Sequence, residues 1–334
     1  MGYLQCFTLK NRAIWQPDMY HGWGRSRSYF EGWYFKIVDA TEKYAFAFIP
    51  GISMDAAGLQ HAFIQVLDGK KCQSEYIRFD ANMFIPSEKK FELEIGENFF
   101  SNDFIKLNLP TIKGELHFEN KIPWPKMLGA PGIMGWYGFM PFMECYHGIV
   151  SLNHNLVGKL NIHGEEIDFT NGRGYIEKDW GVSFPSAWIW LQSNHFHNHL
   201  NNTPISLIAS VARIPWLGTT FNGFIVGFWF EGKLYKFATY TGAKTKIQMH
   251  DNKIDLEFSD RRHTLQISAI KAGTGELVSP IKGEMTGKVS ESLQSELHIK
   301  FFEKNKLIYE GTGRNAGLEA AGEVDKLRSE GIKE

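Results

Sequence analysis

Short runs of hydrophobic residues, separated by Gly, Asn, Asp and Pro, recur along most of the chain and predict an antiparallel β-sheet protein. Short apolar runs bounded by turn residues are typical of strands. The clearest examples are residues 44–50, 60–67, 205–213, 224–230 and 263–271. Glu231-Gly232 and Asp251-Asn252 separate such runs at hairpin spacing, and Gly supplies the positive φ that tight turns need. We therefore expect an all-β fold.

The length of 334 residues predicts two compact units, since one hydrophobic core rarely serves so long a chain. The polar sequence GEEIDFTNGR at residues 164–173 interrupts the strand pattern. We expect domains at residues 1–168 and 169–334, although the same segment would also suit a long hairpin inside one unit. Residues 318–333, rich in Ala, Glu and Lys, predict a short C-terminal helix.

Composition and charge exclude several classes of partner. Lys and Arg number 36 against 37 Asp and Glu, without a block of like charge, so we expect no nucleic-acid partner. The sequence contains no run of 18 hydrophobic residues, so we expect no membrane-spanning helix. The chain has three cysteines, Cys6, Cys72 and Cys145, which are an odd number and lie far apart in the sequence. This favours reduced thiols over a disulfide framework, and therefore a cytoplasmic location. The aromatic content of 14% suits a bulky apolar ligand.

A carboxylate stands in a hydrophobic row within the expected strand at residues 30–38. Because side chains alternate along a strand, Glu31 shares one face with Trp33, Phe35 and Ile37. Tyr34 points to the opposite face. Burial raises the pKa of such an acid, which makes Glu31 a candidate proton donor. The alternative is an ordinary ion pair with a nearby Arg or Lys.

The sequence PFMECYHGIVS at residues 141–151 repeats this theme. Alternation places Glu144 and Tyr146 on one face and His147 on the other, so Glu144 and His147 cannot form an acid and base pair within the strand. Each needs a partner from elsewhere in the chain. A core histidine with satisfied hydrogen bonds is the alternative for His147.

The densest pattern is at residues 172–196, where two acids precede a row of aromatic and amide side chains. Glu177 and Asp179 share a face with Tyr175, and the row that follows is Trp188, Trp190, Gln192, Asn194 and Phe196. Indole faces stabilise cations by about 0.5–2 kcal/mol each, although the same row also suits a core. Asp179, beside Trp180, is the favoured acid, whereas Glu177 and Lys178 suit a surface ion pair.

Three histidines alternate in HFHNH, namely His195, His197 and His199, at a spacing compatible with zinc. The sequence then enters the turn-like NNTP, and no carboxylate is close enough in sequence to orient the imidazoles. We therefore expect no metal site. The glycines at 129, 132, 135 and 138 form neither a phosphate-binding GxGxxG nor a P-loop, and they predict turns or close packing.

Three motifs resemble the tocopherol cyclase family over nearly the whole chain. They are FEGWYFK at residues 30–36, YIEKDWGVSFPSAWIWLQSN at 175–194 and RNAGLEAAGE at 314–323. Similarity to plant members is patchy between these motifs. Within the second motif, plant members read EKNWG where this chain reads EKDWG, and they lack the extra histidines at His197 and His199. The resemblance implies two lipocalin-like antiparallel β-barrel or sandwich halves, related to carotenoid-hydratase-type proteins, and a cycloisomerase that needs no cofactor.

In the reaction that the resemblance implies, an acid protonates a prenyl double bond, a tertiary cation forms, and the neighbouring phenol oxygen closes a chromanol ring. We expect Asp179, Glu31 or Glu144 as the acid. We expect the indole rings of Trp33, Trp188 and Trp190 to stabilise the cation. We expect Gln192, Asn194 and His147 to contact the phenol. Tyr34, Tyr146 and Trp180 are expected to line the same site.

The expected ligand is an apolar prenylated aromatic or isoprenoid small molecule, and peripheral contact with a membrane is compatible with it. Two other functions stay open at this stage. A carrier of isoprenoid quinones would explain the aromatic residues without an acid, since a fold does not fix a function. A hydratase would capture the same cation with water in place of the phenol.

Overall fold

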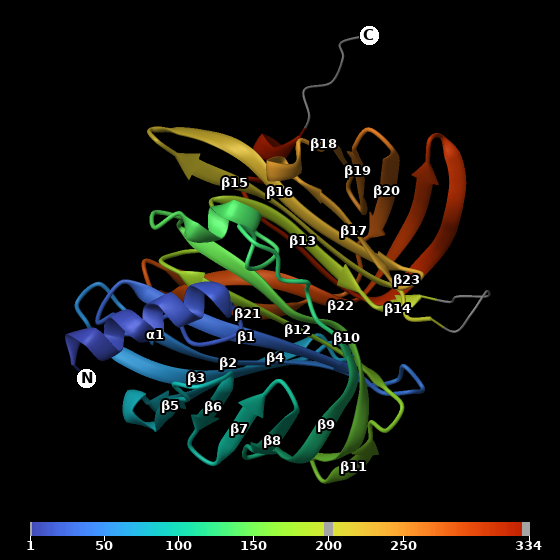
Figure 1. Cartoon of the computed structure of the whole chain (residues 1–334). Helices are drawn as coiled ribbons and strands as arrows, with labels where there is room; N and C mark the ends of the chain where they lie inside the picture. Colours follow the sequence, from blue (N-terminus) through green and yellow to red (C-terminus); the bar gives the residue numbers. More distant parts are fainter. Residues whose placement is uncertain (1, 197–202, 329–334) are drawn as a thin grey trace. The chain divides into compact units, whose positions relative to one another are not determined.

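The computed structural model describes residues 2–196 and 203–328, and it is built almost entirely from antiparallel strands (Figure 1). The described chain contains one α-helix, α1 (Tyr3–Trp15), and four short 3₁₀ helices. It divides into two compact units. The first comprises Met1–Phe184 with Glu276–Lys288, and the second comprises Pro185–Gly275 with the chain after Val289. The all-β prediction is confirmed.

The sheet of the first unit is a large antiparallel arrangement of lipocalin-like, up-and-down type. Among the described residues its order is β4-β3-β2-β1-β12-β10-β9-β8-β7-β6-β5, with β11 paired to β10. The strands are β1 (Tyr29–Val38), β2 (Ala45–Met54), β3 (Gln60–Asp68), β4 (Gln73–Asp80), β5 (Phe84–Pro86), β6 (Glu92–Ile95), β7 (Asn98–Ser101), β8 (Phe104–Asn108), β9 (Ile112–Ile122), β10 (Cys145–Ile162), β11 (Glu165–Asp168) and β12 (Arg173–Gly181). The 3₁₀ helices η1 (Ala81–Met83) and η2 (Gly135–Phe139) connect them.

Alternation along these strands builds one hydrophobic core in the first unit. Trp33, Phe35 and Ile37 of β1 are buried there with Ile176 and Trp180 of β12, as the expected alternation requires. The strands from β5 to β9 contribute further side chains to this core, among them Phe84, Leu93 and Leu116. β12 lies between β1 and β10, so its side chains meet two neighbouring strands on each face.

The second unit repeats the antiparallel design. Its sheet follows the order β17-β16-β15-β13-β23-β22-β20-β19-β18 among the described residues, with β14 paired to β23 and β21 to β22. The strands of this sheet are β13 (Ala187–Ser193), β14 (His195–Phe196), β15 (Ser206–Trp216), β16 (Thr219–Phe230), β17 (Lys233–Ala238), β18 (Lys244–Met249), β19 (Lys253–Ser259), β20 (His263–Ile270), β21 (Gly275–Ile281), β22 (Glu284–Glu303) and β23 (Lys306–Gly322). Of these, β21 from Glu276 onward and β22 as far as Lys288 belong to the first unit. η3 (Thr239–Thr241) and η4 (Val324–Leu327) complete the described chain.

Turn chemistry fixes the hairpins where the sequence predicted them. Glu231 and Gly232 connect β16 to β17 with positive φ angles of 49° and 73°, and Asp251-Asn252 lies between β18 and β19. The division expected between residues 168 and 169 falls inside the first unit, because β12 hydrogen-bonds to β1 and β10 of that unit.

The helices differ from the prediction. The expected helix at 318–333 is wrong in its described part, because residues up to Gly322 continue β23 and only the four-residue η4 follows. Pairing with β13 and β22 outweighs the helix propensity of Ala and Glu there. The α-helix lies instead near the N-terminus. Among the described residues, no helix is long and apolar enough to cross a membrane.

Candidate functional site

The central strand β12 carries a different group of polar side chains on each of its faces. The register pairs Trp33 of β1 with Lys178, and it pairs His147 of β10 with Asp179. Directly opposite residues in an antiparallel pair share a face. Lys178 therefore faces the core of the first unit, while Asp179 faces the other side of the sheet. We call the two groups the inner cluster and the outer cluster.

The inner cluster is centred on Glu31, whose side chain is completely buried. Its carboxylate accepts hydrogen bonds from the backbone N–H groups of His21, at 2.9 Å, and Gly22, at 3.0 Å. The Tyr29 hydroxyl donates a further bond, and the Lys178 ammonium forms an ion pair with the same carboxylate. A buried charge with this many donors and a cationic partner is a stable counter-ion.

Lys178 is the cation of this cluster, and it is also completely buried. Its Nζ atom donates to the carbonyl oxygens of Pro17, at 3.2 Å, and Met19, and it lies 2.7 Å from His21 Nδ1. The expected surface ion pair between Glu177 and Lys178 is therefore wrong. The side chain points inward on a strand that alternates, and its partner comes from β1 instead.

The electrostatics of the inner cluster favour the charged pair. Burial alone would raise the pKa of Glu31, but the Lys178 ammonium and the His21 hydrogen bonds outweigh it, and the pKa of Glu31 is lowered. Burial lowers the pKa of Lys178 to about 8 against the opposing effect of Glu31. Burial, with Lys178 nearby, lowers the pKa of His21 to about 4. Glu31 thus holds a negative charge and lacks the raised pKa that the sequence suggested.

Aromatic rings enclose the Lys178 ammonium. Its Nζ lies 4.6 Å from the ring centre of Trp33 and 4.7 Å from that of Trp180. Trp33 also stacks on Phe91, with centroids 5.3 Å apart. The ring of Trp180 stacks on Tyr146 at 5.4 Å, and on His21 at 4.1 Å. The expected lining residues Trp33, Tyr146 and Trp180 therefore pack around a resident cation.

The outer cluster joins His147 of β10 to two acids of β12. His147 Nδ1 lies 2.8 Å from Asp179 Oδ1, and His147 Nε2 lies 3.5 Å from Glu177 Oε2. The imidazole thus bridges the two carboxylates through its two nitrogens. The Asp179 side chain is 27% exposed, against 12% for His147 and 5% for Glu177. Asp179 is the member most accessible to a ligand.

Hydroxyl groups and glycines surround this cluster. The Tyr175 hydroxyl donates to Glu177, and Tyr34 of β1 lies directly opposite Glu177 in the register. Burial, followed by the Glu177 charge, raises the pKa of Tyr175, so this phenol stays protonated. Gly32 lies opposite Asp179, and a side chain is therefore missing next to the accessible carboxylate.

The outer cluster is also the group in the described chain whose donors could hold a metal ion. One donor atom each from His147, Glu177 and Asp179 lie within 4.8 Å of one another. One imidazole and two carboxylates suit a divalent cation. In the structure both ring nitrogens already face carboxylate oxygens, so a metal would have to replace the imidazole bridge. Of the histidines considered for zinc, His195 is buried in β14, and His197 and His199 lie outside the described residues.

Glu144 lies just before β10, where its carbonyl oxygen accepts a hydrogen bond from Val182 at 2.8 Å. Its side chain is half-buried, and burial raises the pKa of Glu144. Glu144 therefore has the raised pKa that a proton donor needs. Glu144 precedes His147 in the chain and lies outside β10, so the expectation that strand alternation directs the two side chains apart stays a prediction.

The remaining predicted residues belong to the second unit. Trp188 and Trp190 of β13 share a face with Gln192, and the core residues Ile189 and Leu191 point the other way. Trp188 Nε1 donates to Glu319 at 2.6 Å. Trp190 lies over Gly317, where a Cβ atom would come within 2.5 Å of its ring. Gln192 and Asn194 are buried. Their roles toward a phenol stay predictions.

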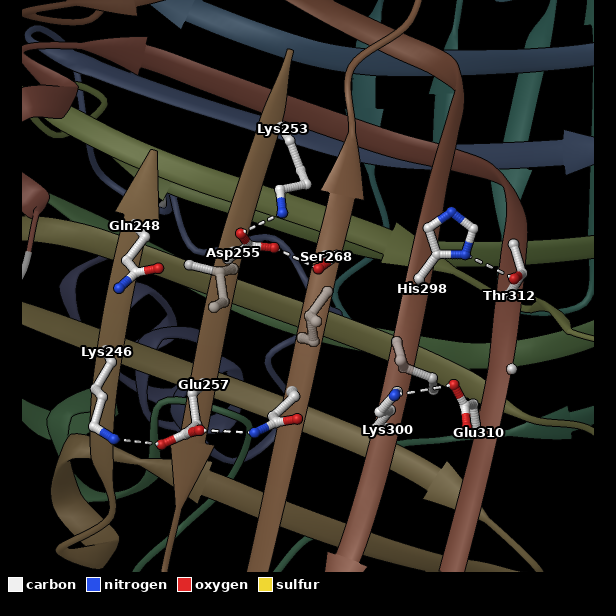
Figure 2. Close-up of a pocket in the computed structure, with 15 residues that line it drawn as sticks. Lys246, Gln248, Lys253, Asp255, Glu257, Ser268, His298, Lys300, Glu310 and Thr312 are labelled. Carbon is white, nitrogen blue, oxygen red and sulfur yellow. Dashed lines mark hydrogen bonds and ion pairs between the residues drawn. The ribbon is translucent and has the colours of Figure 1, made fainter. Parts of the chain in front are cut away.

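A depression of about 570 Å³ lies on the second unit, over β18, β19, β20, β22 and β23. Figure 2 shows that its charged side chains pair with one another. Lys246 bonds to Glu257 at 2.9 Å, and Lys253 bonds to Asp255 at 2.7 Å. Such pairs are ordinary for a solvated sheet face, so we do not assign the site here.

Comparison with known proteins identifies the family. The model of the family described as Tocopherol cyclase-like matches residues 110–322, which is well over half of the chain. This chain belongs to the tocopherol cyclase-like family. The expected resemblance is confirmed, and the matched residues include His147, Glu177 and Asp179 of the outer cluster.

Two curated relatives support this family assignment at low sequence identity. A protein of Oryza sativa subsp. japonica named "Probable tocopherol cyclase, chloroplastic" is 23% identical and covers 94% of this chain and 80% of its own length. Tocopherol cyclase, chloroplastic, of Zea mays is 22% identical over 94% of this chain and 79% of its own length. Both names state a chloroplastic protein, which contradicts our expectation of a cytoplasmic location. The cysteine content on which it rested says nothing about organelles.

A solved structure supports the fold of this family member. The crystal structure of CghA with Sch210972 has a TM-score of 0.55 and 11% sequence identity, and it covers 88% of this chain and 89% of the other. At this identity the likeness is one of fold alone. None of the expected roles of individual residues follows from it.

Proposed function

We propose that this family member is an isomerase that closes a chromanol ring on a prenylated hydroquinone by protonating the prenyl double bond. One observation carries the proposal, namely the 2.8 Å pair between His147 and Asp179 in the most accessible part of the outer cluster. Acid-catalysed cyclisation needs a proton donor and a proton acceptor held together. The Tocopherol cyclase-like family supports the class of reaction.

The pair of His147 and Asp179 can both supply the proton that the alkene takes up and recover the proton that the phenol releases. Asp179 delivers a proton to the less substituted alkene carbon, and a tertiary cation forms. The phenol oxygen attacks that cation and forms the new C–O bond. His147 accepts the phenol proton and returns it to the Asp179 carboxylate, so the site is unchanged after each turnover. The Glu177 carboxylate, 3.5 Å from His147, stabilises the positive charge on the ring during this transfer.

The other acids fit the role of donor less well. Glu31 is paired with Lys178 and has a lowered pKa, which makes it a fixed negative charge. Its burial against an ammonium also leaves no room for an alkene at the carboxylate. Glu144 has a raised pKa and is half-buried, so it is the second candidate for the acid. Asp179 is preferred because it has a proton acceptor in contact.

The test is an assay of the purified protein with a prenylated hydroquinone under anaerobic, reducing conditions in D₂O. We expect a single-enantiomer chromanol that carries one deuterium on carbon. General acid catalysis contributes about 10²–10⁴-fold, so Asp179→Asn should lose turnover by at least about 100-fold with substrate binding retained. Asp103→Asn, an equal change at an exposed ion pair of the same unit, is the matched control and should keep full activity.

The same assay separates the competing functions. A product heavier by one water would identify a hydratase, and tight binding of unchanged substrate would identify a carrier. Loss of turnover in Glu144→Gln, with Asp179→Asn fully active, would move the acid to Glu144. Full activity in both variants would refute the proposed mechanism.

A further inference from the structure

Helix α1 turns hydrophobic side chains toward solvent in the first unit. Leu9 and Ala13 anchor the helix in the core, whereas Leu4, Phe7 and Trp15 are exposed, Phe7 at 57%. At 100° per residue, these three side chains lie within one side of the helix. A helix that packs only for stability would bury such residues. An exposed hydrophobic face of this kind marks a candidate interaction surface.

The charge of α1 restricts that partner. Its sequence, YLQCFTLKNRAIW, contains Lys10 and Arg12 and no acid. Two acids lie near the helix: Glu88 accepts a hydrogen bond from Gln5 at 2.7 Å, and Asp18 is paired with the cation Lys126 at 4.0 Å. The helix therefore presents hydrophobic and cationic groups together, a combination that suits an anionic lipid surface.

A second exposed hydrophobic segment lies between β9 and β10. Its ends are fixed by buried Trp124 and Met143. Between them, a Met127–Ala130 bridge closes a tight turn that projects Leu128, which is 98% exposed. Trp136 and Phe142 of this segment are 42% and 50% exposed. A projecting tip of this kind has no concave shape for a small ligand.

The two segments adjoin at the C-terminal end of α1. The rings of Trp15 and Phe139 contact edge to face at 5.4 Å. Lys126 Nζ lies 4.0 Å from Asp18, and the Cβ position of Gly132 lies 3.3 Å from Pro17. We define the docking surface as the exposed hydrophobic side chains of both segments, namely Leu4, Phe7, Trp15, Met127, Leu128, Trp136 and Phe142.

We propose that this docking surface binds the interfacial region of a lipid bilayer that contains anionic lipids. Exposed Trp side chains prefer the lipid headgroup region, and the Leu and Phe side chains enter the acyl boundary. Lys10 and Arg12 of α1 supply the cations that attract anionic headgroups. The inference does not depend on the proposed reaction, and it would hold equally for a carrier.

The test is sedimentation of the full chain with extruded vesicles, made either of phosphatidylcholine alone or of phosphatidylcholine with about 30% phosphatidylglycerol. We expect binding to the anionic vesicles that weakens with salt. The double variant Phe7→Ser/Leu128→Ser should lower the partition coefficient at least about tenfold, since each buried methylene contributes about 0.8 kcal/mol. Lys10→Gln should weaken binding to anionic vesicles only.

The matched control is Leu217→Ser, since Leu217 is 82% exposed at a hairpin tip of the second unit. Binding of this variant should equal that of the wild type. Circular dichroism and turnover on detergent-dispersed substrate report whether Phe7→Ser/Leu128→Ser is folded and active. Absence of vesicle binding by the wild type, or an equal loss in Leu217→Ser, would overturn the proposal. A concentration-dependent dimer that only the double variant abolishes would assign the surface to a second copy of the chain.

Discussion

Removal of the buried ammonium of Lys178 should destabilise the first unit strongly. The Lys178→Met variant keeps an unbranched side chain as far as the Cε position but removes Nζ, so the Glu31 carboxylate is left buried without a cation. Glu31 retains the N–H groups of His21 and Gly22 and the Tyr29 hydroxyl, so the carboxylate is still hydrogen-bonded. Breaking a buried ion pair from one side costs about 3–5 kcal/mol, and we expect a loss in that range.

The double variant Lys178→Met/Glu31→Gln separates the ion pair from the other contacts. It removes both charges, so its loss in free energy of unfolding should be smaller than the sum of the losses in the two single variants by about 2 kcal/mol or more. Urea unfolding with hydrogen exchange on peptides of β1 and β12 is the assay, because two units need not unfold together. The matched control is the exposed pair of the second unit, Lys246→Met/Glu257→Gln, where the coupling should be under about 1 kcal/mol.

Two results would refute this reasoning. One is a loss below about 1 kcal/mol in Lys178→Met, which would mean that Glu31 is neutral or reached by solvent. The other is strict additivity in the double variant, which would mean that the two groups act independently. Either result would return Glu31 to the set of candidate proton donors.

Two further outcomes follow from the same structure. Gly51→Ala should cost about 1–3 kcal/mol in thermal unfolding, since its Cβ would lie 2.5 Å from a backbone oxygen, whereas Gly32→Ala, with ordinary contacts, should cost less than about 1 kcal/mol. His147→Gln should lower kcat more than it raises KM in the cyclisation assay, because it removes the proton acceptor next to Asp179.

Local patterns in the sequence predicted the strands and their faces correctly. The period of two placed Trp33, Phe35 and Ile37 in the core, and it placed Glu177 and Asp179 on one side of their strand. Glycine and asparagine at the hairpins marked the turns for the same local reason. These features depend on neighbours in sequence, so a single chain is enough to read them.

Partners distant in sequence could not be predicted in this way. The pairing of Lys178 with Glu31, 147 positions apart, depends on the register between β1 and β12. The pairing of His147 with Asp179 depends on β10, which has two irregularities in its register against β12. The helix α1 was missed because its exposed hydrophobic residues blur the amphipathic pattern. The structure supplied each of these through tertiary contacts.

The alternation of Glu177, Lys178 and Asp179 along β12 also limits how this protein can change. A substitution at Asp179 alters the accessible face and leaves the buried ion pair in place, so chemistry and folding can vary separately at adjacent positions. Insertion or deletion of one residue in β12 would instead change both faces of the strand at once. It would turn the lysine outward and drive a carboxylate into the barrel interior. Variant libraries with point substitutions at Asp179 should therefore yield folded proteins, whereas libraries with length changes in β12 should not.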